Sequence, residues 1–267
     1  MEYEWVNYEK EDGIAILTLN RPDRLNSWIP PMRVEARKCI EDTGTDPNVR
    51  VLIVTGAGRG FCAGADVGTF VARAEQADDE PPRARLILPV ATVRLVDALR
   101  SLPKPTIAAV NGIAAGSGTG FALACDVIIA SDQAKFRIAF TRMGIAPGDG
   151  VTWLMTRAIG THRTLELAYT NDVVDAKEME RIGLANRVVP HDELMKAAKD
   201  TAKRMMQIPP LTLAITKKAI YHSLGAHSLE DQIVFEHAAN SAIRDTEDSK
   251  EAARSFVEKR EPLYKGR

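Results

Sequence analysis

The chain has 267 residues, 45% of them hydrophobic and 27% charged, which predicts a globular protein with one large domain or one domain with an appendage. Its 35 basic and 36 acidic residues leave a net charge of -1, and this balance predicts no binding to nucleic acid or to an anionic membrane. Three scattered cysteines, no apolar signal segment and no apolar run of ~18 residues predict a soluble cytoplasmic protein without disulfides or a membrane span.

The first hundred residues combine strand and helix patterns. Residues 6–10 and 14–19 are β-prone runs around an Asp-Gly pair, which predicts a hairpin. Apolar residues at helical spacing predict a helix over residues 31–42, and an apolar run predicts a strand over residues 49–54. Residues 73–100 are charged first and periodic later, which predicts a loop followed by a helix.

The middle of the chain repeats this alternation. We expect strands over residues 106–110 and 126–130, with a helix that starts at residues 121–124 between them. Two further helices are predicted over residues 151–159 and 165–168, separated by a glycine.

The last third has a different character. From residue 192 to residue 265, apolar positions recur only at helical spacing. We therefore divide the chain into a β/α core, residues 1–195, and an all-helical C-terminal region, residues 196–267.

Two glycine-rich loops, residues 60–66 (GFCAGAD) and residues 111–120 (NGIAAGSGTG), each follow an apolar strand pattern. Small residues let the backbone approach a ligand, and a helix N-terminus leaves N–H groups unpaired with a partial positive charge. Two such loops from separate strands can direct two N–H groups at one oxygen, which is the arrangement of an oxyanion hole. Tight turns are the alternative reading, and the repetition of the pattern after two strands favours the ligand site.

Other kinds of site fit the sequence poorly. Residues 55–60 (TGAGRG) follow a strand, but the third glycine falls one position too early for a dinucleotide-binding fingerprint. No tyrosine is followed by lysine four residues later, as a short-chain dehydrogenase would require. The five histidines form no His-Glu-x-x-His motif, and no Gly-x-Ser-x-Gly elbow is present. We therefore expect neither a nicotinamide cofactor nor a metal.

Taken together, the motifs resemble those of the crotonase superfamily, the enoyl-CoA hydratase/isomerase family. The resemblance rests on residues 61–66, 103–112, 125–126, 144–148 and 256–260, with Arg21-Pro22 and Leu25-Asn26 near the start. It implies an α/β fold built as a spiral of ββα turns, with C-terminal helices that assemble a homotrimer or homohexamer. It also implies an acyl-CoA thioester as substrate, with CoA as part of the substrate and no separate cofactor.

Site residues follow from the resemblance by position. It assigns the two oxyanion-hole N–H donors to Ala65 and to Ser117, which stands where the family usually has glycine. The residues that it places along CoA are Arg24, Leu25, Ala63, Asp66, Val67, Phe256 and Lys259.

The chain departs from the family at both glutamates that a hydratase uses to activate water. Gly120 and Phe140 stand at those two positions, and neither can move a proton. General acid–base catalysis contributes ~10²–10⁴-fold in rate. We therefore expect plain enoyl-CoA hydration to be slow or absent.

Asp149, in the turn of residues 147–150 (PGDG), is the leading candidate for a catalytic acid/base. Isomerases and dehalogenases of the family carry an aspartate one position earlier, at Gly148 here, whereas members that resemble 6-oxocamphor hydrolase share the Pro-Gly-Asp-Gly turn. The alternative is that Asp149 caps the helix that begins at residue 151. Both readings stay open on the sequence alone.

Three functions follow from these residues. The first is isomerisation or addition/elimination on an unusual acyl group of an acyl-CoA, through a thioester enolate. The second is CoA-independent retro-Claisen hydrolysis of a cyclic β-diketone, against which stands the absence of histidine from residues 1–161. The third is a CoA-binding subunit without catalytic activity.

Overall fold

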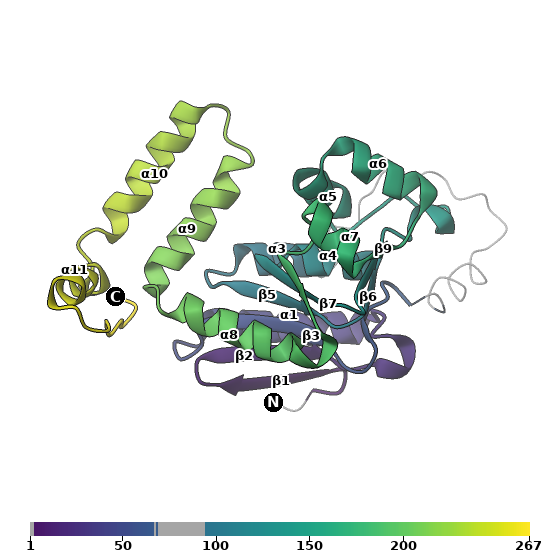
Figure 1. Ribbon diagram of the computed structural model, residues 1–267, viewed down its shortest axis with the longest axis horizontal. Helices are drawn as coiled ribbons and strands as arrows, with labels where there is room; N and C mark the ends of the chain where they lie inside the picture. The colour runs from purple at the N-terminus through teal and green to yellow at the C-terminus, as the bar shows by residue number, and fades with distance from the viewer. Residues whose placement is uncertain (1–2, 67, 69–93) are drawn as a thin grey trace.

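Two β-sheets organise the chain in the computed structural model, which describes residues 3–66, 68 and 94–267 (Figure 1). The larger sheet has six strands in the order β1-β2-β3-β5-β7-β10, and the smaller has four in the order β4-β6-β8-β9. The strands are β1 (Val6–Glu11), β2 (Ile14–Leu19), β3 (Val51–Gly56), β4 (Gly60–Cys62), β5 (Thr106–Val110), β6 (Ile113–Ala115), β7 (Val127–Ser131), β8 (Lys135–Arg137), β9 (Val174–Asp175) and β10 (Arg187–Val189).

Ten α-helices and three 3-10 turns connect and cover the sheets in the described part of the chain. The α-helices are α1 (Pro30–Thr45), α3 (Leu95–Ser101), α4 (Ser117–Leu123), α5 (Val151–Ile159), α6 (Thr161–Thr170), α7 (Ala176–Ile182), α8 (Leu194–Met206), α9 (Pro210–Ser223), α10 (Leu229–Ile243) and α11 (Glu247–Glu258). The 3-10 turns are η1 (Pro22–Arg24), η2 (Thr141–Met143) and η3 (His191–Glu193).

From β3 to β8, successive strands alternate between the two sheets, and this alternation builds a spiral. β5 lies in the large sheet, β6 lies in the small one, and α4 follows; β7, β8 and α5 repeat the same ββα order. The pairs β3–β5 and β5–β7, like β4–β6 and β6–β8, are parallel, so each turn stacks on the one before it. The predicted α/β spiral of ββα turns is confirmed.

Local predictions hold where turns and periodicity decide the structure. The N-terminal hairpin turns at Asp12 and Gly13, which both have positive φ, and α5 has the predicted limits. The first helix runs beyond residue 42 to Thr45, and Pro47 follows its C-cap, Asp46. The residue before a proline is sterically disfavoured in the helical conformation. The helix therefore ends at Thr45, before Asp46 and Pro47, rather than at Gly44.

The second glycine-rich segment differs from the prediction because its last four residues are already helical. α4 begins at Ser117, whereas the sequence predicted a start at residues 121–124. A Cβ on Gly118 would overlap the carbonyl oxygen of Cys62. The glycines therefore serve close packing of a helix against β4, which local propensity does not reveal.

Hydrophobic cores lie on both faces of the large sheet. On one face, Leu194, Ala198 and Ala202 of α8 pack with strand residues such as Ile53 and Ile107. On the other face, α1, α3 and α4 cover the sheet in a larger core. α8 thus packs directly on the sheet, and the boundary between residues 195 and 196 stays a prediction.

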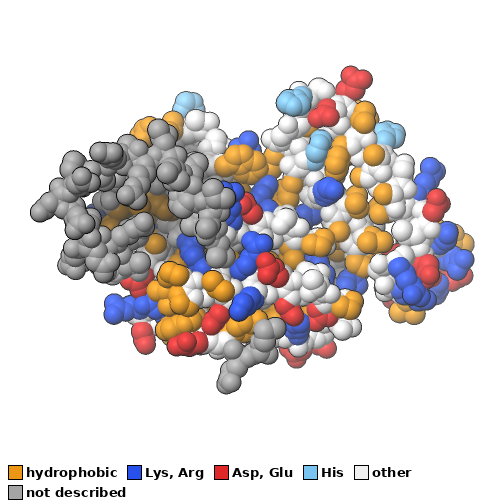
Figure 2. Space-filling model, turned by 180° about the vertical axis from the view of Figure 1, so that it is seen from behind, with side chains coloured by type: hydrophobic (Ala, Val, Ile, Leu, Met, Phe, Trp, Pro, Cys, Tyr) orange, Lys and Arg blue, Asp and Glu red, His pale blue; other side chains and the backbone are white. Residues whose placement is uncertain are grey.

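α9 and α10 leave the body of the molecule as an antiparallel pair, on the side away from α5 and α6 (Figure 1). No residue of α9 is buried, and Gln232 is the one buried residue of α10. Hydrophobic side chains gather on the surface of this pair in Figure 2. No described helix is long and apolar enough to cross a membrane.

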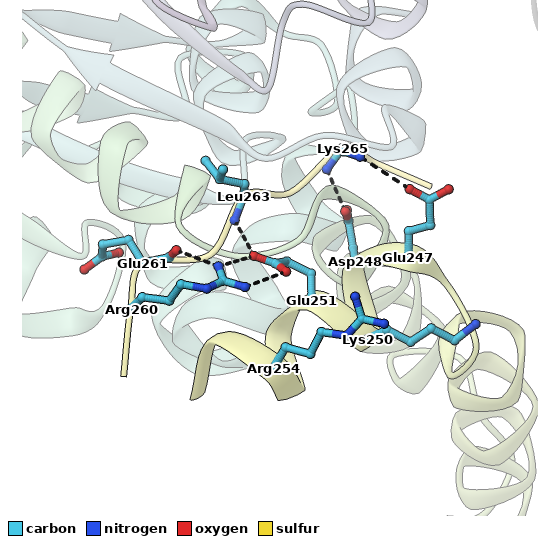
Figure 3. A pocket seen from close by; sticks show the side chains of 9 residues that line it. All are labelled: Glu247, Asp248, Lys250, Glu251, Arg254, Arg260, Glu261, Leu263 and Lys265. Atoms are coloured by element: carbon cyan, nitrogen blue, oxygen red, sulfur yellow. Dashed lines mark hydrogen bonds and ion pairs between the residues drawn. The ribbon is translucent and has the colours of Figure 1, made fainter. Parts of the chain in front are cut away.

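The C-terminal tail folds back on α11 and encloses a hollow of about 610 Å³ (Figure 3). Glu251 accepts hydrogen bonds from Arg260 at 2.5 Å and from the Leu263 N–H at 3.0 Å. Asp248 accepts one from the Lys265 N–H at 2.6 Å. The acidic side chains Asp248 and Glu251 that line this hollow are occupied in holding the tail in place. We therefore assign these residues a structural role and do not consider the hollow a substrate site.

Candidate active site

The two glycine-rich segments meet at the junction of the small sheet and α4. A Cβ on Gly64 would lie 2.7 Å from the Ala115 carbonyl oxygen and 3.5 Å from the Ser117 nitrogen. Gly64 also has a φ of 91°, in the region that favours glycine. The first loop can therefore approach the start of α4 only with glycine at this position.

Hydrogen bonds hold the first loop in place. The Trp28 N–H donates to the Gly64 carbonyl oxygen at 2.7 Å, and the Asp66 N–H donates to the Trp28 carbonyl oxygen at 3.1 Å. The Ala65 N–H, between these two contacts, donates to no acceptor in the described part of the chain. It is therefore available to a ligand.

The second loop presents a matching donor. Ser117 is the first residue of α4, so its N–H has no partner within the helix. The preceding residue, Gly116, donates its N–H to the Arg137 carbonyl oxygen at 3.0 Å, which ties the start of α4 to β8. The structure brings Ala65 and Ser117 together as the sequence predicted, and their role as an oxyanion hole stays a prediction.

A cavity of about 310 Å³ opens beside these two residues. Its lining combines small residues of both loops with side chains from β8, η2 and the end of α6. The lining residues are Ala63, Gly64, Ala65, Gly116, Ser117, Arg137, Ala139, Phe140, Arg142, Met143, Ile145 and Asn171.

Phe140, at the second glutamate position, forms part of the cavity wall. A Cβ on Gly116 would lie 3.7 Å from its Cζ, and one on Gly148 would lie 3.9 Å from its Cε1. The ring thus fills the space between the start of α4 and the turn that carries Asp149. A Cβ at Gly148, where the resemblance places the aspartate of isomerases, would make only this ordinary contact.

Gly120, which the resemblance places at the first hydratase glutamate, packs directly against Asp149. A Cβ on Gly120 would lie 2.5 Å from the Asp149 carbonyl oxygen and 3.4 Å from the Asp149 Cβ. Real Cβ atoms essentially never approach a carbonyl oxygen so closely. No side chain can occupy position 120 with the backbone as it stands, and the Asp149 side chain lies beside this position.

Asp149 does not cap α5. The N-cap residue is Gly150, and no side chain makes a capping hydrogen bond there, so the capping alternative is wrong. The Asp149 carboxylate instead accepts a hydrogen bond from the Arg33 guanidinium at 3.0 Å. Its backbone has a φ of 49°, an uncommon conformation for a residue other than glycine.

Arg33 comes from the first turns of α1 and lies against the aromatic ring of Trp28, with its Cζ 5.3 Å from the ring centroid. Its side chain is only 19% exposed, so the ion pair with Asp149 is partly shielded from water. Asp149 itself does not line the described cavity; it lies beside Gly120, one helical turn along α4 from Gly116. Sequence reasoning missed Arg33 because 116 residues separate it from Asp149 and no local pattern links them.

Cys62 is the nearest thiol to this region. Burial raises the pKa of Cys62 to about 12, and Arg33 and Asp149 exert smaller opposing effects. A protonated, buried thiol is a poor nucleophile. Cys62 is therefore part of the core and not a reactive group.

The predicted CoA contacts divide into two groups. Leu25 and Ala63 adjoin each other, since the Ala63 N–H donates to the Leu25 carbonyl oxygen at 2.9 Å. Arg24 precedes Leu25 at the end of η1, and Asp66 pairs with Arg21 at 2.6 Å, which lowers the pKa of Asp66. These four residues thus cluster around the first glycine-rich loop.

The other predicted contacts do not join this cluster within one chain. Phe256 and Lys259 lie on and just after α11, at the far end of the molecule from α6 (Figure 1). Val67 lies outside the described residues. The described residues contain no group of three or more His, Cys, Asp or Glu side chains that could hold a metal ion.

Comparisons with known proteins agree with this architecture. The family described as enoyl-CoA hydratase/isomerase matches residues 9–267. A 1,2-epoxyphenylacetyl-CoA isomerase of Escherichia coli K12 is 35% identical, over 99% of both chains.

Solved structures agree as well. An enoyl-CoA hydratase of Bacillus anthracis superposes with a TM-score of 0.88 at 30% identity, over 99% of this chain and 100% of that one. A monofunctional enoyl-CoA isomerase of M. smegmatis superposes with a TM-score of 0.71 at 38% identity, over 86% of this chain and 98% of that one.

Proposed function

Because the chain belongs to the enoyl-CoA hydratase/isomerase family and is an enzyme that acts on acyl-CoA, we propose that it catalyses isomerisation or addition/elimination through a thioester enolate. Plain hydration of an enoyl-CoA is not its main reaction in this proposal. The observation that carries it is the packing of Asp149 on Gly120, which sets the Asp149 side chain beside position 120 and leaves no room there for a glutamate.

The two unpaired N–H groups explain how an enolate would be stabilised. The thioester oxygen would accept hydrogen bonds from Ala65 and Ser117, whose N–H groups have no described acceptor. Removal of one such donor typically costs about 2.7–4 kcal/mol of transition-state stabilisation. These donors act most strongly on the charge that develops once a proton leaves the α-carbon.

Asp149 is the proposed acid/base. In an isomerisation, its carboxylate takes a proton from the α-carbon of a 3-enoyl thioester, and the electron pair moves toward the thioester oxygen. The same carboxyl group then returns the proton to the γ-carbon, so that the double bond moves into conjugation and no atom is gained or lost. One carboxylate suffices for this sequence, whereas hydration uses two to position and deprotonate water.

Two relatives support isomerisation as the reaction class. The Escherichia coli relative is a 1,2-epoxyphenylacetyl-CoA isomerase, and the M. smegmatis relative is an enoyl-CoA isomerase. Neither name identifies the acyl group that this chain accepts.

Exchange of the α-protons of butyryl-CoA with D2O, followed by NMR, tests this proposal without knowledge of the natural substrate. We expect exchange by the wild type and a loss of ~10²–10⁴-fold in Asp149→Asn, because the amide cannot accept the proton. Calorimetric binding of butyryl-CoA should be retained in this variant. Asp200→Asn, an exposed change on α8, is the matched control.

Two results would overturn the assignment. Exchange in Asp149→Asn at the wild-type rate would show that Asp149 is not the base. Rapid hydration of crotonyl-CoA by the wild type would show that other groups replace the missing glutamates.

The two alternatives predict different results in the same assay. A non-catalytic CoA-binding subunit would bind butyryl-CoA without any exchange. A CoA-independent hydrolase of cyclic β-diketones would bind no acyl-CoA. No histidine lines the described cavity, which disfavours that hydrolase as a second candidate.

We also propose that the C-terminal helices assemble the chain into a homotrimer or homohexamer. Phe256 is 86% exposed and Val257 is 79% exposed, and α9 buries none of its residues. Assembly would cover these apolar side chains, and it would allow Phe256 and Lys259 to approach CoA bound to a neighbouring copy.

A further inference from the structure

The cavity beside Ala65 and Ser117 carries an unbalanced positive charge. Arg137 and Arg142 both line it, whereas none of its described lining residues is acidic. Neither arginine forms an ion pair with a described residue, whereas Arg21, Lys217 and Arg260 each pair with a carboxylate. Phe140, Met143 and Ile145 supply an apolar wall next to these charges.

Arg137 is held in position rather than free to move into solvent. Its backbone belongs to β8, and its Nε donates a hydrogen bond to the Asn171 carbonyl oxygen at 3.0 Å. The side chain is half-buried, and its two terminal nitrogens have no described acceptor. When Nε is engaged in this way, the N–H groups of the two terminal nitrogens remain available in one plane. This planar set of donors matches the two oxygens of a carboxylate.

Asn171, which also lines this cavity, carries an uncharged donor without a partner. The Ala139 N–H donates to its Oδ1 at 2.9 Å, and a backbone N–H can be received only by the oxygen of the amide. The Nδ2 is therefore the remaining group, and it is buried without a hydrogen-bond partner. Asn171 has a φ of 59° as the C-cap of α6, so its orientation is set by both backbone and side chain.

Ser117 presents a second unsatisfied group. Its Oγ is buried and has no hydrogen-bond partner, and the residue itself is only 4% exposed. Buried polar groups in folded proteins nearly always have partners. Two unsatisfied groups, both on residues that line one cavity beside two unpaired arginines, point to a ligand that accepts hydrogen bonds.

We propose that this cavity receives an acyl group that ends in a carboxylate, so that the substrate is the mono-CoA thioester of a dicarboxylic acid. The carboxylate would accept hydrogen bonds from Arg137, Arg142 and Asn171, while the hydrocarbon part lies against Phe140 and Met143. This inference rests on the proposed acyl-CoA function and names its substrate class. A phosphate of CoA could meet the same arginines, and the experiment separates these two sources of negative charge.

Calorimetry with four matched pairs of ligands tests the proposal. Malonyl-, succinyl-, glutaryl- and adipoyl-CoA are each compared with the uncharged straight-chain acyl-CoA of the same number of acyl carbons. Both members of a pair carry the same CoA, so their affinity ratio reports only the acyl end. We expect at least one pair to favour the carboxylate by roughly tenfold or more in the wild type.

Variants assign the preference to the cavity. Arg142→Met should reduce the ratio several-fold without a change in affinity for the uncharged member, and this exposed residue can change without loss of folding. Asn171→Asp keeps an oxygen for the Ala139 N–H but places negative charge in the cavity, so it should abolish the preference. Arg137→Met should also reduce the affinity ratio several-fold. The control is Arg163→Met, which changes an exposed arginine on α6.

Three outcomes would overturn the proposal. Equal affinity within all four pairs would show that the cavity does not recognise a carboxylate, while the acyl-CoA function would stand. An equal loss for both members in the arginine variants would show that the arginines bind a phosphate of CoA. No binding of any acyl-CoA would remove the proposed function together with this inference.

Discussion

Position 120 and Asp149 illustrate how one residue can depend on another that is distant in sequence. Gly120 is buried inside α4, where a glycine ordinarily weakens a helix. Its value lies in the contact with the Asp149 backbone, which leaves no room for a Cβ. A side chain at position 120 and the present turn of Asp149 therefore exclude each other.

Substitution of Gly120 tests this exchange. Gly120→Ala should lower the free energy of unfolding by about 1–3 kcal/mol, because the new Cβ would meet the Asp149 carbonyl oxygen at 2.5 Å. Gly148→Ala is the matched control, because its Cβ would make only an ordinary contact at 3.9 Å. Urea denaturation measures both variants. Equal stability of the two variants would show that the turn of Asp149 can move away from a Cβ at position 120 without a loss of folding free energy.

Among the elements, α9 is fastened to the sheet by a cluster of partly buried polar groups. Asp126 accepts hydrogen bonds from the Thr106 N–H at 2.8 Å and from the Tyr221 hydroxyl at 2.5 Å, and it pairs with Lys217 at 2.9 Å. Burial lowers the pKa of Lys217, whereas Asp126 acts to raise it. This cluster ties the second half of α9 to the residue that precedes β7.

Removal of the carboxylate charge should loosen α9. Asp126→Asn leaves a buried ammonium without an opposite charge, which should cost on the order of 3 kcal/mol in the free energy of unfolding. In an Asp126→Asn/Lys217→Met double variant, most of this loss should be recovered. The same cost in the wild-type and Lys217→Met backgrounds would show that the two charges are not coupled.

The contact between α11 and the tail should depend on pH. The hydrogen bond from Arg260 and the one from the Leu263 N–H lower the pKa of Glu251 from 4.5 to about 2. A carboxyl group whose pKa is lower in the folded state stabilises that state fully above its unfolded value. This stabilisation is lost as the pH falls from 4.5 through about 2.

Comparison of Glu251→Gln with the wild type isolates this effect. The difference in urea midpoint should be constant near neutral pH and should shrink once the pH falls below 4.5. Glu166→Gln, on the exposed surface of α6, should show no such trend. A difference that stays constant at acidic pH would mean that ionised Glu251 does not hold the tail.

For the whole molecule, the exposed apolar surface of the C-terminal helices is the dominant feature (Figure 2). Leu229 is 75% exposed and Val234 is 63% exposed, on a helix with one buried residue. Large exposed apolar patches in soluble chains mark surfaces that associate. A single copy with this surface open to water is an unfavourable state.

Sedimentation velocity tests the assembly directly. We expect the wild type to sediment as a trimer or hexamer, and Val234→Arg to shift it toward smaller species, because a buried unpaired charge at an interface is costly. The comparison variant is Lys218→Glu, which reverses the charge at an exposed position of α9. A monomeric wild type at micromolar concentration would contradict the proposed assembly.

The sequence by itself determined the features that depend on neighbouring residues. The hairpin around Asp12 and Gly13, the limits of α5 and the two glycine-rich segments were all predictable, because turn geometry and side-chain periodicity act over a few residues. The resemblance assigned predicted roles to Ala65, Ser117 and the two glutamate positions in the same way, since motif positions are read along the chain, and these roles stay predictions.

Only the tertiary structure decided which distant residues meet. Arg33 contacts Asp149 although 116 residues separate them in the sequence, and Asn171 contacts Ala139 across 32 residues. α4 begins at Ser117, earlier than predicted, because Gly118 allows the helix to pack closely on β4. No local pattern encodes these contacts, because they depend on how sheets and helices pack. That packing also makes Gly150 the N-cap of α5 and pairs the Asp149 carboxylate with Arg33, while the acid/base role of Asp149 stays a prediction.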